Sequence, residues 1–485
     1  MQSVFDKKPL AQIYEEIRQV YLSDNRPWIL GFSGGKDSTC MVQIVWHALS
    51  DLSSEKLHKK IYIISSDTLV ETPPIIARIT NSLKKISDAA KKSHLPISTN
   101  LLEPKLSDTF WVRLLGLGYP APTTLFRWCT DMLKIQNADR FIKEKVSQYG
   151  EAIVLLGTRK DESSRRKTNM ESYKIENSVL SRHSEYQQTY VYTPLEDFTS
   201  DDVWNYLLQN KNPWGEENRD LLSLYQDANA KECPLVIDST TESCGTGRFG
   251  CWTCTVVDNN KALSNLIENR LEWMEHLAEL REELKKTQDP EMWKKVREIK
   301  RRSGRVELRQ YGDTESTVYT PGPYTMEFRR WYLEKLLQGQ MRVQKEGPDP
   351  NMELIREEEI HEIQRIWRME QGDWQNSAYQ IYEKVTGKKL ESVKDDLGGF
   401  GKTEEELLVQ TCTKHGVPIK LVSKLLNAEF ETQGTTRHSK IFGKIKKILS
   451  EEWRENLDEI LTELKEQKSA KERVKPPQKT EESAN

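Results

Sequence analysis

Six residues between an apolar stretch and an amphipathic one carry the clearest chemistry in this chain. Ser33-Gly34-Gly35-Lys36-Asp37-Ser38 directly follows the apolar run from Trp28 to Phe32, so a glycine-rich loop joins a predicted strand to a predicted helix. Glycine lets a backbone approach an anion closely, and the first N–H groups of a helix carry partial positive charge. The loop is not a Walker A sequence, because Asp37 rather than Ser or Thr follows Lys36. The pattern predicts that these six residues bind the phosphates of a nucleotide.

The same stretch fits two other interpretations. Gly31-Phe32-Ser33-Gly34-Gly35 matches the G-x-S-x-G nucleophile elbow, in which Ser33 would attack a substrate as a hydrolase nucleophile. Such an enzyme needs Asp and His partners downstream, and none of the eight His residues stands in a recognisable partner sequence. A glycine-rich turn without chemistry is the third interpretation. Downstream loops favour the nucleotide site.

Two further loops carry polar side chains at the ends of predicted strands. Asp67 and Thr68 follow the second strand, and Arg159, Arg165 and Arg166 follow a later one. Parallel strands bring their carboxyl ends to one edge of a sheet, so these loops should converge with the glycine-rich loop. Carboxylates can coordinate Mg²⁺ or hydrogen-bond a ribose or adenine, and arginines can hold phosphates in a bidentate manner. Lys36, Asp37 and the three arginines are therefore candidate catalytic residues.

Cysteines cluster at one place in the chain. Cys233, Cys244, Cys251 and Cys254 fall within 22 residues. This density predicts a metal site in a reducing compartment. Sulfur ligands suit either zinc or an iron-sulfur cluster, and the spacing alone does not decide between them. Two other cysteines, Cys40 and Cys412, are expected to pack inside helices.

The predicted elements alternate in the first half of the chain. Strand-like segments occupy 27–32, 60–65, 96–102 and 152–157, and helix-like segments occupy 37–49 and 74–93. This alternation predicts an α/β fold with a doubly wound parallel sheet covered on both faces. Later, residues 194–207 predict a turn, a Thr or Ser cap and an amphipathic helix.

Helical periodicity replaces the alternation after residue 258. Expected helices span 261–287, 290–303, 324–337 and 353–371, and the residues from 466 lack apolar anchors. The expected organisation is a nucleotide-binding domain at 1–230, a cysteine-rich metal segment at 231–257, a mainly helical extension at 258–465 and a disordered tail at 466–485.

Composition limits the partners and the location. The formal net charge is -3, so nucleic acid would have to bind local basic patches. Mean hydropathy is -0.72, and neither a membrane span nor the apolar core of a signal peptide is present, so we expect a cytoplasmic protein. Two basic stretches are candidates. The first comprises Lys294, Lys295, Arg297, Lys300, Arg301, Arg302, Arg305 and Arg309, expected on a helix at 291–309, and the second comprises Arg437, Lys440, Lys444, Lys446 and Lys447.

The order of these segments resembles the PAPS reductase and ATP pyrophosphatase superfamily over residues 27–210. The shared sequences are SGGKDS, D-T with E-T-P, R-W-C-T-D-x-x-K, G-T-R-x-D-E-S-x-x-R, P-L and D-V-W. The reductases carry Gly after Asp-Thr, where this chain has Leu69. The resemblance implies that Arg127 and Lys134 join the nucleotide site. It also implies a 4Fe-4S cluster on Cys129, Cys251, Cys254 and a fourth cysteine, for which Cys244 is preferred to Cys233. A zinc ribbon of Cys233, Cys244, Cys251 and Cys254 is the alternative.

The whole chain resembles the DndC family of DNA phosphorothioation sulfurtransferases. It lacks the E-C-G-x-H tail of the reductases and contains TPGPYTMEFRRWYLEKLL and KHGVP in its extension. The resemblance implies adenylation of a DNA phosphate by ATP with Mg²⁺, release of pyrophosphate, and replacement of a nonbridging oxygen by sulfur. The implied partners are DNA, a cysteine desulfurase, an ATPase subunit and a small DNA-binding subunit. A tRNA thiolase or a sulfonucleotide reductase is the alternative, as is a noncatalytic scaffold.

Overall fold

The computed structural model divides the chain into two compact units. Unit 1 comprises Met1–Val112, Ala121–Lys285 and Gln338–Ile355, and unit 2 comprises Arg113–Pro120, Lys286–Leu337 and Arg356–Asn485. The structure describes residues 3–228, 250–268, 271–310, 317–390, 402–430, 439–454, 456, 459–464 and 466. Cys233, Cys244 and nearly all of the tail expected at 466–485 lie outside these ranges. The four expected domain boundaries stay predictions.

A six-stranded sheet forms the centre of unit 1, in the order β3-β2-β1-β4-β6-β5. Five strands run parallel, and β5 pairs antiparallel with β6 at one edge. In the middle of the sheet Leu30 lies between Ile63 and Leu155. The strands are β1 (Trp28–Gly31), β2 (Ile61–Ser66), β3 (Ile97–Leu102), β4 (Ala152–Leu155), β5 (Leu180–Arg182) and β6 (Thr189–Tyr192).

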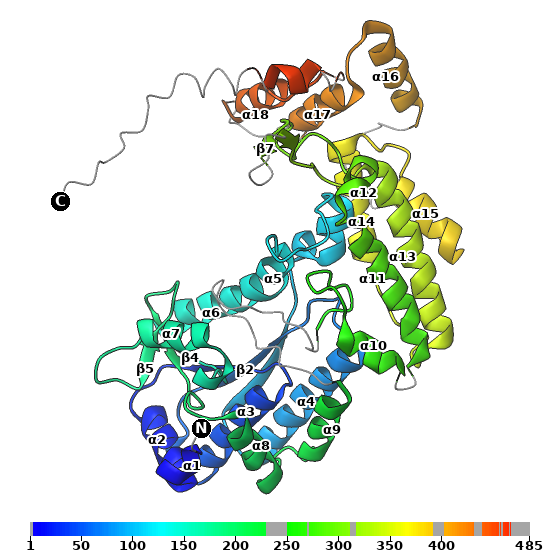
Figure 1. The fold of residues 1–485 in the computed structure, drawn as a ribbon. Coiled ribbons are helices and arrows are strands. Elements are labelled where there is room, and N and C mark those ends of the chain that lie inside the picture. The colour runs from blue at the N-terminus through cyan, green and yellow to red at the C-terminus, as the bar shows by residue number, and fades with distance from the viewer. Residues whose placement is uncertain are drawn as a thin grey trace, which may run out of the picture. The chain divides into compact units, whose positions relative to one another are not determined.

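Helices cover both faces of this sheet, as the apolar runs of its strands require. Alternate residues of β1 point to opposite sides, so Trp28 and Leu30 join one core and Ile29 joins another. Helices α2 (Leu10–Leu22), α3 (Lys36–Ser50), α4 (Pro73–Lys92), α8 (Ser200–Gln209) and α9 (Asn218–Ala228) supply the first core, and α6 (Gln136–Tyr149) supplies the second. In Figure 1, α6 lies on one side of the strands, and α3, α4, α8 and α9 lie on the other. The predicted doubly wound α/β fold is confirmed.

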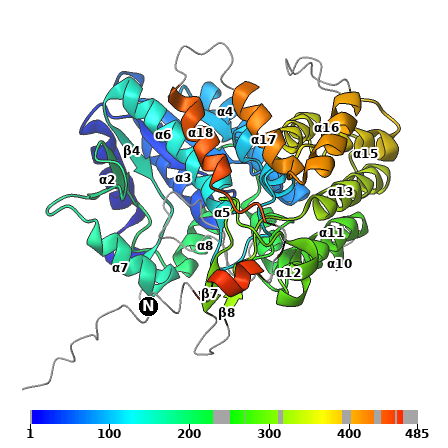
Figure 2. The same cartoon turned by 90° about the horizontal axis from the view of Figure 1, so that it is seen from above.

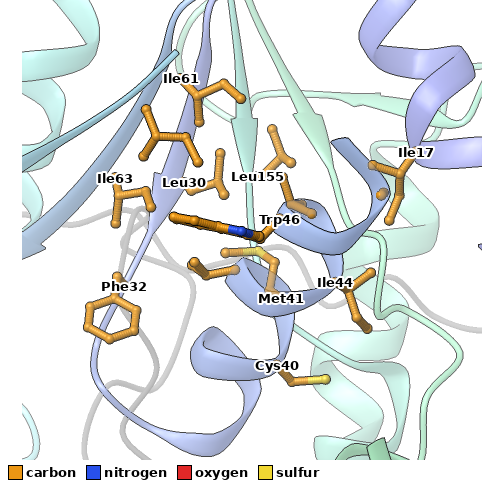
Figure 3. Close-up of a cluster of buried hydrophobic side chains, with 14 of the residues drawn as sticks. Ile17, Leu30, Phe32, Cys40, Met41, Ile44, Trp46, Ile61, Ile63 and Leu155 are labelled. Atoms are coloured by element: carbon orange, nitrogen blue, oxygen red, sulfur yellow. The ribbon is translucent and has the colours of Figure 1, made fainter. Parts of the chain in front are cut away.

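The first core is built around α3, the helix that follows the glycine-rich loop. Met41, Ile44 and Trp46 of α3 lie against Leu30, Ile63 and Leu155 of the strands (Figure 3). Cys40 is fully buried in the same cluster, so its predicted packing role is confirmed. This packing fixes the start of α3, and with it Lys36 and Asp37, at the carboxyl end of β1.

Local signals explain other helices of unit 1. The Thr199 side chain accepts a hydrogen bond from the Asp202 N–H, and the Asp202 carboxylate accepts one from the Thr199 N–H at 2.9 Å, so a capping box starts α8 where the sequence predicts a cap. The remaining elements are α1 (Val4–Lys7), η1 (Ser54–Lys56), η2 (Leu106–Asp108), α5 (Trp128–Thr130), η4 (Asp131–Ile135), η5 (Lys160–Glu162), α7 (Ser164–Ser172), α10 (Lys261–Glu268), η6 (Glu272–Met274) and α11 (Glu275–Lys286, whose last residue belongs to unit 2).

Unit 2 is mainly helical in its described part, with the hairpin of β7 (Leu308–Gln310) and β8 (Thr317–Tyr319). Helices α17 and α18 lie side by side in Figure 1 and Figure 2. Like α11, two further elements, η3 (Val112–Gly116) and α13 (Met326–Glu346), contain residues of both units. The other helices are α12 (Pro290–Val296), α14 (Glu357–Ile366), η7 (Trp367–Gln371), α15 (Ser377–Thr386), α16 (Lys402–His415), α17 (Ile419–Phe430) and α18 (Ser439–Leu449). In α16, Cys412 is 4% exposed, as predicted.

The prediction of a basic helix at 291–309 is wrong. Helix α12 ends at Val296, and Arg297 continues in an extended conformation. The Arg297 guanidinium donates to the Gly322 carbonyl at 2.5 Å and to the Pro321 carbonyl at 3.2 Å. These tertiary contacts replace the helical ones, so Lys300, Arg301 and Arg302 lie in an irregular segment. The helix expected at 261–287 is likewise divided into α10, η6 and α11.

None of the helices in the described ranges combines the length and apolar character needed to cross a membrane.

Candidate functional site

The glycine-rich loop lies between the end of β1 and the start of α3, at the carboxyl edge of the sheet. Gly34 has a φ of +71°, a conformation that side chains rarely adopt, and a Cβ atom there would lie 3.1 Å from Ile79. The Ser38 hydroxyl lies 3.1 Å from the Ser33 hydroxyl and donates to the Gly35 carbonyl at 3.0 Å. The loop is therefore fixed by its own hydroxyl groups and leads directly into the amino end of a 15-residue helix.

Three buried charges meet at this helix end. Lys36 and Arg159 are each 3% exposed, and Asp37 is 8% exposed. The Asp37 carboxylate accepts from Arg159 Nε at 2.5 Å and lies 3.3 Å from the Lys36 ammonium. Arg159 comes from the loop after β4, so the predicted convergence of two loops occurs here. Asp161 lies 3.7 Å from Arg159 as a second carboxylate, so these cations are balanced by carboxylates. The first N–H groups of α3 remain the feature of this place that suits an anionic ligand.

Burial changes the acid–base behaviour of these groups. Burial, together with the nearby Arg159 cation, lowers the pKa of Lys36 to about 7. Burial also lowers the pKa of Arg159, while Asp161 opposes this change. A lysine with a pKa of about 7 can gain or lose a proton at neutral pH. Its charge state therefore responds to an anion that binds beside it.

Two contacts at this site were not predicted from the sequence. Gly157 packs against the start of α3, where a Cβ atom would lie 3.0 Å from the Asp37 carbonyl oxygen. The Tyr225 hydroxyl of α9 accepts a hydrogen bond from the Lys36 N–H at 3.1 Å. Gly157 directly precedes Thr158 and Arg159, so it belongs to a loop that the sequence predicts to be part of the site. Tyr225 stands 189 residues from Lys36 without any local pattern, so no sequence signal pointed to it.

The nucleophile-elbow interpretation finds no support. The Ser33 side chain pairs with Ser38 Oγ, and no histidine of the described ranges hydrogen-bonds Ser33. A Ser-His pair is the defining contact of such a hydrolase.

A second polar group surrounds Cys251 in unit 1. Cys251 Sγ lies 3.4 Å from Thr68 Oγ1 and 3.8 Å from Glu71 Oε1. The Lys134 ammonium pairs with Glu71 at 3.2 Å. Burial raises the pKa of the Cys251 thiol, Glu71 and Cys129 raise it further, and Lys134 opposes them. The structure thus gathers Thr68, Lys134, Cys129 and Cys251 from separate segments, and it adds Glu71, which sequence reasoning did not select.

These residues bear on the proposed iron-sulfur cluster. Cys254 lies in the same turn as Cys251, because its N–H donates to the Cys251 carbonyl at 3.2 Å. Cys129 is near enough to Cys251 to influence its pKa. The fourth expected ligand, Cys244, and its alternative, Cys233, are outside the described ranges, within which no group of three or more His, Cys, Asp or Glu has metal-binding geometry. The three described thiols therefore do not by themselves form a metal site, and the ligand set stays a proposal.

The other predicted residues lie in loops and in helix α7. Asp67 accepts from the Leu69 N–H at 2.8 Å, and Arg127 is the residue before α5. Arg166 pairs with Glu162 and lines a cavity of about 100 Å³ beside α7 and β6, together with Arg182 and His183. Arg165 is exposed on α7. Among the three candidate arginines, Arg159 is the one that pairs with Asp37 in the part of the chain that the structure describes.

Two segments match known family models. Residues 27–257 match the phosphoadenosine phosphosulfate (PAPS) reductase domain. Residues 403–450 match a small protein found in certain Dnd DNA modification systems. The first match covers the sheet, the phosphate loop and the described cysteines Cys129, Cys251 and Cys254. The second covers most of α16, α17 and α18.

Individual relatives are more distant. An uncharacterized protein of Methanocaldococcus jannaschii is 25% identical over 242 residues, which are 50% of this chain and 39% of that protein. The chain therefore spans about two fifths of that relative. A PAPS reductase of Candida auris in complex with phosphate is 16% identical, with a TM-score of 0.28 over 45% of this chain and 88% of that one. A U34-tRNA thiolase of Methanococcus maripaludis with its 4Fe-4S cluster is 13% identical, with a TM-score of 0.28 over 57% and 80%.

The family-model match and the sheet agree on the nature of this region. The matched residues contain the doubly wound sheet, with the phosphate loop at its carboxyl edge. Residues 27–257 are therefore similar in sequence to the PAPS reductase domain, and their described part has a PAPS reductase-like fold.

Proposed function

We propose that the protein is a sulfurtransferase that activates a DNA backbone phosphate with ATP and replaces a nonbridging oxygen by sulfur. The buried Lys36–Asp37–Arg159 group is the observation that carries this proposal. It places two cations at the amino end of α3, beside a loop whose sequence suits phosphates. A PAPS reductase-type domain supplies the matching context for chemistry on a nucleotide.

The charges have specific tasks in this reaction. The loop Ser33–Ser38 and the Lys36 ammonium hold the β- and γ-phosphates, and Mg²⁺ screens their negative charge. Arg159 stabilises the charge that develops at the α-phosphate when a DNA oxygen attacks it and pyrophosphate leaves. Asp37 keeps both cations in place. Arg165, Arg166, Asp67 and Arg127 are further proposed contacts of the nucleotide.

The sulfur step completes the exchange. The terminal sulfur of a persulfide, made by a cysteine desulfurase, attacks the activated phosphorus, and AMP leaves with the original oxygen. A second thiol then cleaves the sulfur–sulfur bond as a disulfide forms. Cys129, Cys244, Cys251 and Cys254 would hold a 4Fe-4S cluster, which when bound would tune the electrostatics of the site. Lys134 and Glu71 would orient the Cys251 side of that site.

The match of residues 403–450 favours DNA as the substrate. The matched model describes a small protein found in certain Dnd DNA modification systems, and this chain carries the corresponding helices at its own C-terminal part. We therefore propose that further subunits of such a system, an ATPase subunit and a small DNA-binding subunit, assemble with this chain. A tRNA thiolase is the second candidate function, because the PAPS reductase-like domain alone does not indicate whether the substrate is DNA or tRNA.

An incorporation assay tests the proposal. Purified protein receives ATP, Mg²⁺, a cysteine desulfurase with ³⁵S-labelled cysteine, the partner subunits, and either duplex DNA or tRNA. We expect label in DNA as a phosphorothioate and none in tRNA. Label in tRNA alone would replace the proposed function by the second candidate. The Lys36→Met variant is the matched control for ATP dependence.

A further inference from the structure

A cavity of about 620 Å³ lies within unit 2, and the proposed ATP chemistry does not use it. Its walls come from the segment after α12, the turn η7, the helices α17 and α18, and the segment after α18. A volume of this size lies within the range of about 300–1,000 Å³ that is typical of ligand sites. The question is which chemistry its lining suits.

The lining is strongly basic. Among the described residues that line it, nine are Lys or Arg and four are Glu. Lys300, Arg301 and Arg302 come from the first basic stretch, and Lys444 and Lys447 of α18 come from the second. The two stretches, 142 residues apart between Arg302 and Lys444, are therefore parts of one site. The sequence had predicted them as separate patches.

The acidic side chains of the lining are already paired. The pairs are Glu298 with Lys420 (3.4 Å), Glu370 with Arg302 (3.5 Å), Glu451 with Lys424 (2.6 Å) and Glu452 with Arg454 (2.7 Å). Lys447 has no acidic partner among the residues that the structure describes, and its side chain is exposed. The carboxylates thus neutralise only part of the lining, and the cavity keeps an excess of positive charge.

One cation of the lining is rigidly held. Arg329 is 1% exposed and donates to the Tyr324 carbonyl at 2.8 Å and to the Gly116 carbonyl at 2.9 Å. Gly118 leaves room for this guanidinium, because a Cβ atom there would collide with it. Burial lowers the Arg329 pKa to about 10, so the group is still charged at neutral pH. A fixed charge of this kind is part of the fold rather than an effect of mobile surface lysines.

We propose that this cavity binds the phosphodiester backbone of DNA. Its cations come from several elements, among them the segment after α12, α13, α17 and α18, and so large a number of cations suits a chain of phosphates better than a single small anion. The phosphate part of the inference follows from the charge of the lining. The choice of DNA over another polyanion rests on the proposed function.

Two adjacent lysines of α18 make a matched test. Lys447 lines the cavity, whereas Lys446 is exposed on the same helix and is not part of the lining. The affinity of the full chain for a fluorescent DNA duplex is measured by anisotropy from about 50 to about 200 mM salt. We expect Lys447→Gln to weaken binding several-fold at low salt and to reduce the salt slope by about one unit. Lys446→Gln should leave both quantities close to the wild-type values.

The double variant Lys444→Gln/Lys447→Gln should show a larger loss, and its thermal midpoint verifies that it folds. Equal effects of Lys446→Gln and Lys447→Gln would overturn the proposal, because they would indicate a diffuse surface contact. An acidic polypeptide that competes as strongly as unlabelled duplex would also overturn it, in favour of a protein partner.

The same samples separate this inference from the proposed function. If wild-type protein puts sulfur into DNA while Lys447→Gln binds DNA normally, the cavity assignment fails and the function stands. If Lys447→Gln loses DNA affinity while wild-type protein with its partners puts no sulfur into DNA, the function fails and the cavity assignment stands.

Discussion

In the phosphate loop of unit 1, Lys36 and Arg159 are each 3% exposed and share the carboxylate of Asp37, whereas Lys444 and Lys447 in the cavity of unit 2 are exposed. Buried charges are costly to desolvate and are held in one geometry, so they can orient a reacting phosphate. Exposed cations contribute screened, nearly additive affinity with little geometric demand. The difference suggests that one region performs the reaction and the other supplies affinity.

The largest expected effect is on the reaction. Lys36→Met removes the ammonium but keeps most of the side-chain volume, so we expect pyrophosphate release from ATP to fall by about 100-fold or more. The fold should persist, because the variant no longer has to desolvate a cation. The exposed residue Lys56 of unit 1 provides the control, and Lys56→Met should release pyrophosphate at the wild-type rate. A Lys36→Met enzyme with normal turnover would remove this residue from the mechanism.

The second-largest expected effect is on the free energy of unfolding, which should fall more at the buried site than at the cavity. Asp37→Asn removes the nearer carboxylate of the buried Arg159 and leaves only Asp161, at 3.7 Å, and we expect this to cost about 3 kcal/mol in the free energy of unfolding. Glu298→Gln breaks a half-exposed pair with Lys420 in the cavity wall and should cost no more than about 1 kcal/mol. Urea unfolding of both variants measures the contrast. Similar losses at the two sites would mean that burial does not separate them.

Proton uptake provides a third test of the buried site. With a pKa of about 7, Lys36 is mostly neutral at pH 8 and mostly charged at pH 6. A bound triphosphate favours the charged form and raises this pKa, so binding should take up close to one proton at pH 8 and much less at pH 6. Calorimetry of the ATP complex in buffers of different ionisation enthalpy counts these protons. The Lys36→Met variant should take up none from this residue, and equal uptake in both proteins would assign the proton elsewhere.

The smallest effect concerns the loop after β2. Leu69 has a φ of +63°, a conformation that costs a leucine about 1 kcal/mol. Leu69→Gly should therefore leave the thermal midpoint unchanged or raise it slightly. Leu22→Gly, which makes the same change at the end of helix α2, should lower the midpoint. A clear loss for Leu69→Gly would show that packing of this side chain outweighs the backbone strain.

Local signals made the first half of the fold predictable. The alternation of apolar runs and turns gave four of the six strands within one or two residues, and the Thr199 cap gave the start of α8. Strands β5 and β6 were missed because they are only partly buried and form no continuous apolar run, unlike the equally short but fully buried strands β1 and β4. The end of α12 was missed because Arg297 bonds to carbonyls more than 20 residues away.

The candidate site likewise has some residues that the sequence predicts and others that it does not. Lys36, Asp37 and Arg159 stand in recognisable loops, and the topology of a parallel sheet explains why they meet. Tyr225 and Glu71 became visible only when the fold brought them to Lys36 and Cys251. The basic cavity could not be derived from charge runs, because its two walls are joined by tertiary packing alone.

The identity of the small product tests the central claim most directly. The full chain with its partner subunits and duplex DNA receives ATP labelled at the γ-phosphate, and the labelled product is separated by chromatography. The account predicts labelled pyrophosphate, formed in a DNA-dependent manner and lost in Lys36→Met. Labelled orthophosphate with ADP as the product, or pyrophosphate release that persists in Lys36→Met, would contradict it.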